Sequence, residues 1–252
     1  MADAKILGTI LHQSGVSCDS LLVVHSAFAM LSRQGFSADA TVEALLEHVR
    51  DGALFMPTMT WRTVTPAQPN WDEIETPSHT GILSEIFRRR YAIARSIHPT
   101  HSVAGWGRDA PMLLSRHHVD DTPVSANSPY ALMRDYDTFI LMIGVGLEAC
   151  TAIHFAEETI NEALYVLPPE AAETYQCRDR TGIVHQVRTR RHRRLNRDFP
   201  KFAPALIAKG WLHQGQIGPC PWVVVAMRDL LREVFAALLQ SPDATLVQRG
   251  PA

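Results

Sequence analysis

His154 and Glu157 have the residue types and the spacing of a general base and its orienting carboxylate. They lie three residues apart, so a helix would place both on one face. A histidine whose pKa lies near the working pH can take a proton from an attacking group. A carboxylate bonded to the second ring nitrogen fixes the tautomer and stabilises the imidazolium that forms. Glu158, one helical turn from His154, could make the same contact, so the sequence leaves the orienting residue open between Glu157 and Glu158.

The residues before His154 predict how it is positioned. The apolar run 138–143 predicts a buried strand, which ends in Gly144 and Gly146. Thr151 has the residue type of a helix N-cap, so a helix should begin directly before His154. This order places His154 at the carboxyl end of a sheet, where open α/β folds bind ligands. The macrodipole near a helix N-terminus disfavours imidazolium, which keeps the ring ready to accept a proton.

A cysteine and further histidines allow two other chemistries. Cys150 lies four residues before His154, and a thiol just before a helix can have a lowered pKa, so a covalent acyl-enzyme is an alternative. Free cysteines are, however, usually buried packing residues. Histidines also bind zinc, but their spacings here lack a closed nitrogen and sulfur ligand set, so we expect no metal. The histidines concerned are His98, His101, His117 and His118.

A second polar segment, residues 95–102, surrounds Pro99. Arg95, Ser96, His98 and Ser102 could offer backbone N–H groups, hydroxyls and one guanidinium to a pyrophosphate. An ordinary loop with a satisfied arginine is the alternative.

Composition limits the class of protein. The 252 residues are 46% hydrophobic, which predicts one large domain or two small ones; we expect a single domain over residues 1–252. No apolar run reaches the ~18 residues that span a membrane, and the first residues do not resemble a secretory signal. Four widely spaced cysteines then favour reduced thiols and a cytoplasmic protein. A net charge of -2 argues against general polyanion binding.

Strands and helices alternate in the predicted order, which is typical of an α/β protein with a central sheet. We expect strands at 21–25, 53–56, 103–106 and 138–143. We expect helices at about 40–50, 81–90, 110–115, 130–134, 154–165 and 228–239. Residues 166–200 should be polar, irregular or in short strands.

Seven motifs follow one another between about residues 20 and 240. They are Val24-His25-Ser26, residues 56–60, residues 76–78 with 81–88, residues 95–102, Ser128-Pro129, Gly144-Val145 with residues 151–157, and Asp198-Phe199. With these motifs in this order, the chain resembles the aminoglycoside 3-N-acetyltransferases, a family distinct from the GNAT acetyltransferases. Each motif alone is weak, and their order makes the resemblance specific.

The resemblance implies an acetyl-CoA donor, a primary amine acceptor and a mixed central sheet flanked by helices. It implies that His154, Glu157 and Thr151 form the catalytic group, with direct attack of the amine on the thioester. It also implies a coenzyme A site, in which Ser26 could donate to the thioester carbonyl. The residues of that site are His25, Ser26, Ala27, Phe28, Thr58, Arg95, Ser96, His98 and Ser102.

One segment departs from the family pattern. Family members that act on aminoglycosides carry an acidic stretch after the catalytic histidine, whereas residues 187–197 hold six arginines and no carboxylate. Such a stretch should repel polycations. We therefore predict a small amine with an anionic group as the acceptor, bound by Arg188, Arg191 and Arg194, with Asp72 and Glu73 from a shortened loop nearby.

Two other functions remain open at this point. One is an aminoglycoside 3-N-acetyltransferase whose acidic surface lies elsewhere. The other is a non-enzymatic module that binds phosphates or nucleotides through the arginines. We expect no nucleic-acid or membrane partner, and a monomer or homodimer.

Overall fold

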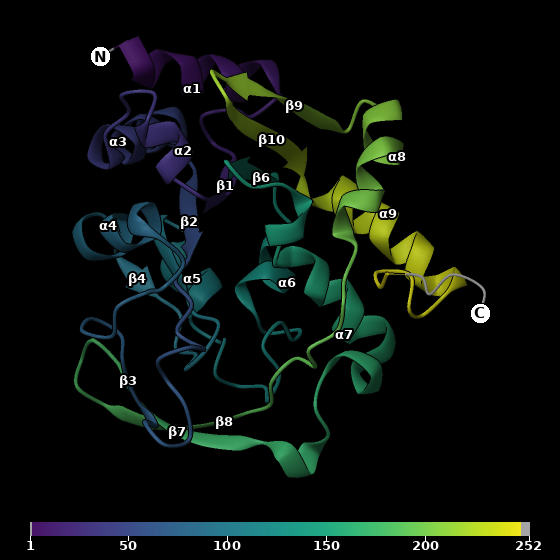
Figure 1. Cartoon of the computed structure of the whole chain (residues 1–252). Helices are drawn as coiled ribbons and strands as arrows, with labels where there is room; N and C mark the ends of the chain where they lie inside the picture. Colours follow the sequence, from purple (N-terminus) through teal and green to yellow (C-terminus); the bar gives the residue numbers. More distant parts are fainter. Residues whose placement is uncertain (1, 248–252) are drawn as a thin grey trace.

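A mixed sheet forms the centre of the protein (Figure 1). The computed structural model describes residues 2–247, so Met1 and residues 248–252 of the expected single domain lie outside the described residues. The sheet strands are β1 (Leu21–Ser26), β2 (Ala53–Pro57), β4 (Ala94–Arg95), β5 (Val103–Gly107), β6 (Thr138–Ile143), β9 (Leu212–Ile217) and β10 (Cys220–Ala226). Within the described residues their order is β4-β5-β2-β1-β6-β10-β9.

Parallel strands form the middle of this sheet. β1 pairs with β2 on one side and with β6 on the other, and both pairs are parallel. The register runs from Leu21 opposite Thr138 to Ser26 opposite Ile143. β5 and β10 run antiparallel to their neighbours, which confirms the predicted mixed sheet. β1 and β6 therefore end at the same edge, and the loops after them begin side by side.

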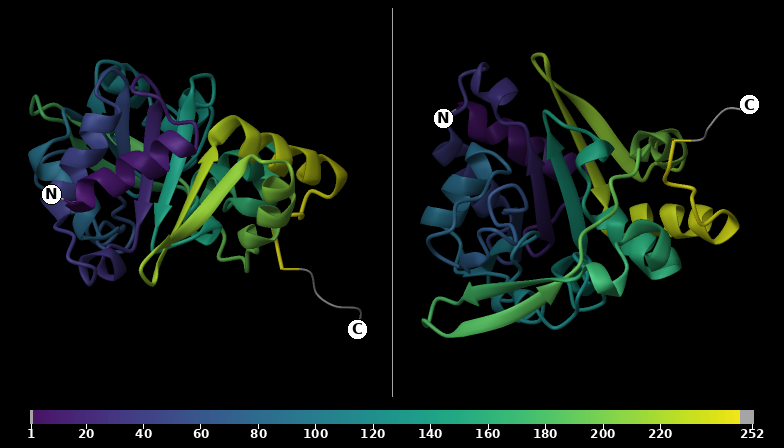
Figure 2. Two further views of the ribbon diagram at one scale, coloured as in Figure 1. Left: turned by 90° about the horizontal axis from the view of Figure 1, so that it is seen from above. Right: turned by 60° about the horizontal axis from the view of Figure 1, so that its bottom comes forward.

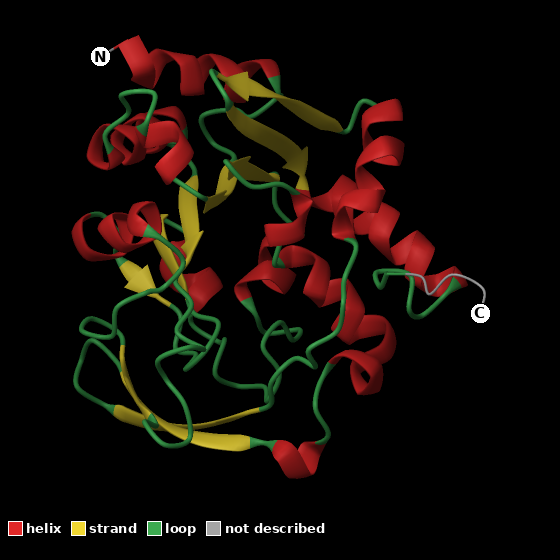
Figure 3. Ribbon diagram, viewed as in Figure 1, coloured by secondary structure: helices red, strands yellow, loops and turns green. Residues whose placement is uncertain are grey.

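Helices cover both faces of the sheet (Figure 3). Alternate strand residues point to opposite faces, so Leu22 and Val24 pack in one core while Leu21 and Val23 pack in the other. The first core includes residues of α1 (Ala2–Gln13), α3 (Ala38–His48) and α4 (Ile82–Arg90). The second includes residues of α5 (Ala110–Leu114), α6 (Pro129–Met133), α7 (Ala152–Tyr165), α8 (Ala203–Ala208) and α9 (Met227–Gln240). The short helix α2 (Ala29–Ser32) follows β1.

A small second sheet lies below the central one in Figure 1 and extends to one side in the right panel of Figure 2. Its strands are β3 (Asn70–Asp72), β7 (Glu173–Arg178) and β8 (Val184–Thr189), in that order. Their inward side chains form a separate core around Trp71 and Tyr175. β7 and β8 fall where the sequence predicted short strands.

The predicted elements agree with the structure to within a few residues, and β6 has the predicted bounds. Ser37 caps α3 by accepting a hydrogen bond from the Ala40 backbone N–H. Several elements were not predicted from the sequence, namely α1, α2, β3, β4, α8 and the hairpin of β9 and β10. Among the described residues, no helix is both long enough and apolar enough to cross a bilayer.

Candidate active site

His154 and Glu157 meet on the first turns of α7, directly after the carboxyl end of β6. The His154 Nδ1 atom lies 2.7 Å from Glu157 Oε2. Glu157 is fully buried, whereas the His154 side chain keeps 19% of its surface exposed. Glu158 does not contact His154, because its carboxylate lies against another histidine. The contact that the sequence left open is therefore made by Glu157.

Residues from distant parts of the chain hold the Glu157 carboxylate. Arg197 Nε donates to both of its oxygens at 3.0 Å. The Thr245 hydroxyl donates to Oε1 at 2.6 Å and also lies 2.8 Å from the Tyr165 hydroxyl. Burial alone would raise the pKa of Glu157, but His154, Arg197 and Thr245 together hold it below its usual value. Glu157 is therefore ionised at neutral pH.

The ionised state of Glu157 fixes the tautomer of His154. An ionised carboxylate can only accept hydrogen bonds, so the Nδ1 atom of His154 must carry the proton between them. The Nε2 atom of the neutral ring is then a proton acceptor, and it makes no hydrogen bond to the described residues. The geometry presents a free basic nitrogen at the sheet edge, which is the arrangement that a general base requires.

A second histidine–carboxylate pair lies beside the first. His192 Nε2 is 2.6 Å from Glu158 Oε1, which also accepts the Val124 backbone N–H at 2.9 Å. The ring of His192 stacks on that of His154, with centroids 4.4 Å apart and planes tilted by 36°. Burial lowers the pKa of His192 well below its usual value and raises the pKa of Glu158 to about 8. The stacked ring therefore stays neutral beside the base.

Further imidazole rings continue this row. His101 lies 5.4 Å from His192, His98 lies 5.8 Å from His101, and His117 lies 4.5 Å from His98, measured between ring centroids. Burial lowers the pKa of each of these three histidines. Within the described residues, no group of three or more His, Cys, Asp or Glu side chains could hold a metal ion.

The ends of β1 and β6 lie side by side at the edge of the sheet. Ser26 is half-buried, Ala27 is exposed, and the Ser26 hydroxyl makes no hydrogen bond to the described residues. Gly144, with φ +70°, passes so close to Ala27 that an added Cβ would lie 2.6 Å from the Ala27 carbonyl oxygen. His25 and Phe28 are buried, and burial lowers the pKa of His25 to about 4. An open strand end with a free hydroxyl can receive a polar ligand.

The segment 95–102 is built differently from the prediction. Arg95 is buried, and its guanidinium donates to the Thr58 and Ser102 hydroxyls and to the Thr58 and Thr76 carbonyls. Thr58 and Ser102 are fully buried partners in this network. The guanidinium of Arg95 thus has its partners inside the protein, and its expected contact with a pyrophosphate stays a prediction that these contacts do not support.

Ser96 and His98 are likewise interior residues. The Ser96 hydroxyl lies 2.8 Å from His117 Nδ1, and His98 Nδ1 accepts the backbone N–H groups of Thr100 and His101. Both side chains are buried, so this segment positions the histidine row rather than facing an open surface. The predicted contact of Ser96 and His98 with a pyrophosphate likewise stays a prediction that their burial does not support.

Thr151 occupies the predicted N-cap position without capping the helix. Its backbone is already helical, with φ -62° and ψ -28°, and its side chain accepts no hydrogen bond from the first turn. A capping side chain needs an extended backbone to reach back to the free N–H groups. The predicted capping contact of Thr151 is therefore wrong, although α7 begins where it was expected.

The arginine stretch carries less free charge than its sequence suggests. Arg190 pairs with Asp121 and Glu162, and Arg197 pairs with Glu157. Arg191 pairs with Glu173 at 2.7 Å and also donates to the Trp61 carbonyl. Three of the six arginines are thus neutralised by carboxylates from other segments, which weakens the predicted repulsion of cations.

The other residues that were predicted to bind the amine acceptor lie partly in the interior and partly on the surface. Arg188 is exposed and donates to the Pro169 carbonyl, and the exposed Arg194 makes no hydrogen bond to the described residues. Asp72 accepts the backbone N–H groups of Ile74 and Glu75 in a turn. Glu73 is buried and binds Arg180 at 2.6 Å. The structure does not bring these residues to His154, and Glu73 is occupied by its arginine.

Cys150 lies in the core. It is buried, and burial raises the pKa of its thiol to about 12. A nucleophilic cysteine needs a lowered pKa and access to its substrate. The geometry therefore favours the packing role over the acyl-enzyme alternative.

Arg197, Thr245 and His192 adjoin the His154–Glu157 pair and were not predicted from the sequence. Arg197 belongs to the arginine stretch, but its partner lies 40 residues earlier. Thr245 lies 88 residues after Glu157. No local pattern connects residues so far apart.

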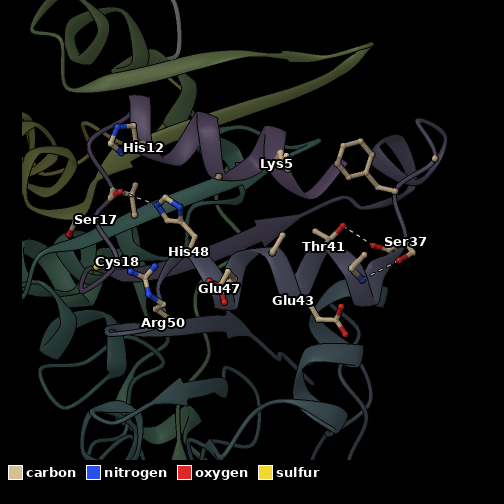
Figure 4. Close-up of a pocket in the computed structure, with 16 residues that line it drawn as sticks. Lys5, His12, Ser17, Cys18, Ser37, Thr41, Glu43, Glu47, His48 and Arg50 are labelled. Carbon is tan, nitrogen blue, oxygen red and sulfur yellow. Dashed lines mark hydrogen bonds between the residues drawn. The ribbon is translucent and has the colours of Figure 1, made fainter. Parts of the chain in front are cut away.

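A cavity of about 920 Å³ lies away from these residues, between α1 and α3 (Figure 4). His12, Cys18 and His48 line it, together with mostly apolar surface. None of the predicted catalytic residues reaches it.

Comparison with known proteins identifies the family. A family model described as aminoglycoside 3-N-acetyltransferase matches residues 23–238. The chain belongs to this family. The family that the sequence motifs suggested is thereby confirmed.

Several relatives and structures of the family are similar to this chain. The YokD aminoglycoside N(3')-acetyltransferase-like protein of Bacillus subtilis is 23% identical over 58% of this chain and 61% of its own length. Aminoglycoside N(3)-acetyltransferase IV of a Salmonella species is 31% identical over 61% of this chain and 58% of its own length. The matched part thus spans about three fifths of these relatives.

Solved structures extend the likeness over the whole fold. A histidine-to-alanine mutant of the acetyltransferase AAC(3)-IVa, solved with a gentamicin, has a TM-score of 0.80 at 24% identity and covers 97% of this chain and 91% of that one. AAC-IIIb, solved with CoASH, has a TM-score of 0.78 at 19% identity and covers 98% of both chains. At these identities the likeness shows the shared fold.

Proposed function

We propose that this protein is an acetyl-CoA-dependent N-acetyltransferase that acts on a primary amine by direct transfer. The observation that carries the proposal is the His154–Glu157 pair, whose free Nε2 atom lies at the carboxyl edge of the sheet in a member of this family.

His154 supplies the base that the reaction needs. An amine at neutral pH is mostly protonated, and it attacks a thioester only after losing a proton. His154 Nε2 accepts that proton while Nδ1 donates to Glu157, and the buried carboxylate stabilises the imidazolium. Arg197 and Thr245 keep the carboxylate in place and ionised. The thioester of acetyl-CoA supplies the acetyl group and a thiolate leaving group.

The end of β1 is the part of the chain that best fits the donor. The Ser26 hydroxyl and the exposed backbone at Ala27 lie at the edge where β6 also ends. A free hydroxyl there can donate to a carbonyl oxygen that becomes negative during attack. We keep Ser26 and Ala27 as donor contacts, with His25 and Phe28 as buried supports behind them.

The acceptor that fits best is an aminoglycoside amine rather than an anionic metabolite. The anionic acceptor rested on the charge of the whole arginine stretch, and Arg190, Arg191 and Arg197 are paired with carboxylates. Of its three predicted contacts, Arg191 is thus neutralised, whereas Arg188 and Arg194 are exposed. The names of the relatives include aminoglycoside N(3)-acetyltransferases, and a solved relative holds a gentamicin. These findings support the aminoglycoside function that the sequence analysis kept as an alternative.

An amine panel tests this proposal. Purified protein is incubated with acetyl-CoA and either gentamicin, kanamycin or a set of amines that carry a carboxylate or phosphonate. Release of free thiol and the mass of the amine product are measured. We expect thiol release and mono-acetylated product with an aminoglycoside. Preferred acetylation of the anionic amines would overturn the acceptor, and the absence of transfer to every amine would overturn the enzymatic function.

A binding measurement separates the non-enzymatic alternative. A phosphate-binding module would be stabilised against heat by nucleotides as well as by acetyl-CoA. We expect stabilisation by acetyl-CoA and not by a nucleoside triphosphate.

A further inference from the structure

An acidic pocket lies beside α7, the helix that also carries the proposed base. Its volume is about 410 Å³, and it lies between the loop 120–126 and the outer turns of α7. Asp120 and Asp121 line it from the loop, and Glu158 and Glu162 line it from the helix. The predicted catalytic residues do not line this pocket, and the proposed function has not used it.

Most of the acidic groups already have partners. Arg190 donates to Asp121 at 2.7 Å and to Glu162 at 2.8 Å. Asp120 accepts the side-chain N–H of Asn127 at 2.9 Å. Three carboxylates besides Glu158 thus face one bonded arginine, so the pocket keeps an excess of negative charge over its own cations.

Glu158 is the exception. Its side chain is only 4% exposed, and its Oε1 atom is occupied by His192 and Val124. Its Oε2 atom is buried and makes no hydrogen bond to any described residue. The nearby Thr122 hydroxyl favours the charged form, but burial outweighs it and raises the pKa of Glu158 to about 8. With no donor at Oε2, this carboxyl group keeps its proton near neutral pH. An ammonium group at Oε2 would supply a donor and a positive charge, and would thereby favour the charged form.

The chemistry of the pocket selects an ammonium group. A primary ammonium carries three donors and one positive charge, which suits a free carboxylate oxygen within a negative surround. Within the described residues no cluster could hold a metal ion, so an organic cation is the better fit. The volume is large enough for one aminated sugar ring.

We propose that this pocket binds a second ammonium group of the acceptor, with Glu158 Oε2 as its anchor. This inference rests on the proposed function, since it places one amine of a polyamine at Nε2 of His154 and another at α7. Glu158 lies between the two positions, because its Oε1 atom holds His192, which stacks on His154. An ammonium group in the pocket is therefore separated from the stacked rings of His154 and His192 by the Glu158 side chain.

The experiment compares acceptors that differ in one amino group. Neomycin and paromomycin differ by an amino group replaced by a hydroxyl, as do kanamycin B and kanamycin A. Binding of each to the protein without acetyl-CoA is measured by titration calorimetry. We expect the amino member of at least one pair to bind about tenfold more tightly or better, the usual contribution of a hydrogen bond between charged groups.

Isosteric variants locate the source of that difference. Glu158→Gln keeps an acceptor for His192 and Val124 but replaces the free oxygen by an N–H donor. Glu162→Gln keeps a bond to Arg190 while removing a charge from a residue that is 49% exposed. Both variants should bring the ratio of the dissociation constants of the two acceptors in a pair close to one. Glu47→Gln, on α3 and in the distant cavity, is the matched control and should leave this ratio unchanged.

The outcomes distinguish this inference from the proposed function. If the protein transfers acetyl groups and both variants keep the affinity difference between the members of a pair, the pocket proposal is overturned and the proposed function stands. If the variants lose this affinity difference but the protein acetylates no amine, the pocket proposal is supported and the proposed function is overturned. Equal binding of both members of each pair by the unmodified protein would also overturn the pocket. If Glu158→Gln fails to fold, Glu162→Gln alone decides.

Discussion

His154 has one ring nitrogen committed to Glu157 and the other free, so its removal should abolish proton transfer without disturbing the donor site. His154→Gln should lose ~10²-fold or more in kcat, the usual contribution of a positioned base. Acetyl-CoA affinity should change little, because the ring lies on the acceptor side of the reaction. Steady-state kinetics and donor titration check both values. His213→Gln, on the exposed edge strand β9, is the control. Normal turnover by His154→Gln at saturating amine would remove it from the mechanism.

Glu157 should affect the rate through its contact with His154. Glu157→Gln removes the negative charge that stabilises imidazolium at His154 and leaves Arg197 without its counter-ion. We expect kcat to fall by ~10²-fold or more. Steady-state kinetics at saturating amine measure the change, and a kcat equal to that of the unmodified protein would show that the carboxylate has no role in the reaction.

Cys150 should tolerate substitution. Its thiol is buried and its pKa is raised to about 12, so the thiolate needed for nucleophilic attack is rare at neutral pH. Cys150→Ala should keep most of the turnover and lose some stability through a small cavity. Mass spectrometry of the protein mixed with acetyl-CoA should find no acetylated cysteine. An acetylated Cys150 that is discharged by amine would establish a covalent route.

At the scale of elements, the closing turn of β6 sets the distance between two strand ends. Gly144 has φ +70°, and a Cβ there would lie 2.6 Å from the Ala27 carbonyl oxygen. Gly144→Ala should therefore push the end of β1 away, destabilise the protein by ~1–3 kcal/mol and lower activity. Gly210→Ala is the matched control, since Gly210 has φ +69° and open space around it. It carries the conformational strain without the clash. Urea unfolding of both variants separates the two effects, and equal losses would exclude a special role of the contact.

Local sequence signals predicted the elements near the site and failed for contacts between distant segments. The apolar run of β6 and the helical spacing of His154 and Glu157 are local, so both were found. The hairpin of β9 and β10 was missed because Pro221, Gly215 and several polar residues interrupt its pattern. The partners of Arg190 and Arg197 come from segments 69 and 40 residues away. For this reason a paired arginine stretch was interpreted as a free one.

At the scale of the whole molecule, the buried histidines should make the protein sensitive to acid. Burial lowers the pKa of His25, His98, His101, His117 and His192 in the folded state. Below pH ~6.5 the unfolded chain binds protons at these rings that the folded chain does not. Stability should thus fall as pH drops from about 6.5 toward 4, by ~1.4 kcal/mol per pH unit for each proton taken up.

Urea unfolding at pH 7, 6 and 5 measures this slope. We expect the midpoint to fall steeply below pH 6.5, and His25→Asn to reduce the slope because it removes one titrating ring. Glu158 acts in the opposite direction, since its raised pKa costs stability as pH rises from about 4.5 to about 8. A midpoint that stays constant or rises on acidification would show that the rings are protonated in the folded protein.

The contact between Thr245 and Glu157 also has a consequence for how the protein is made. Residues 245–247 lie against residues 196–198 through backbone hydrogen bonds from Asp198 to Thr245 and from Val247 to Asn196. Thr245 reaches Glu157 from this position. During synthesis, β6 and α7 leave the ribosome long before Thr245 does, so the nascent chain carries a buried carboxylate that lacks one of its donors. The set of donors around Glu157 is therefore completed last, and a chain interrupted before Thr245 would lack one donor to the proposed orienting carboxylate.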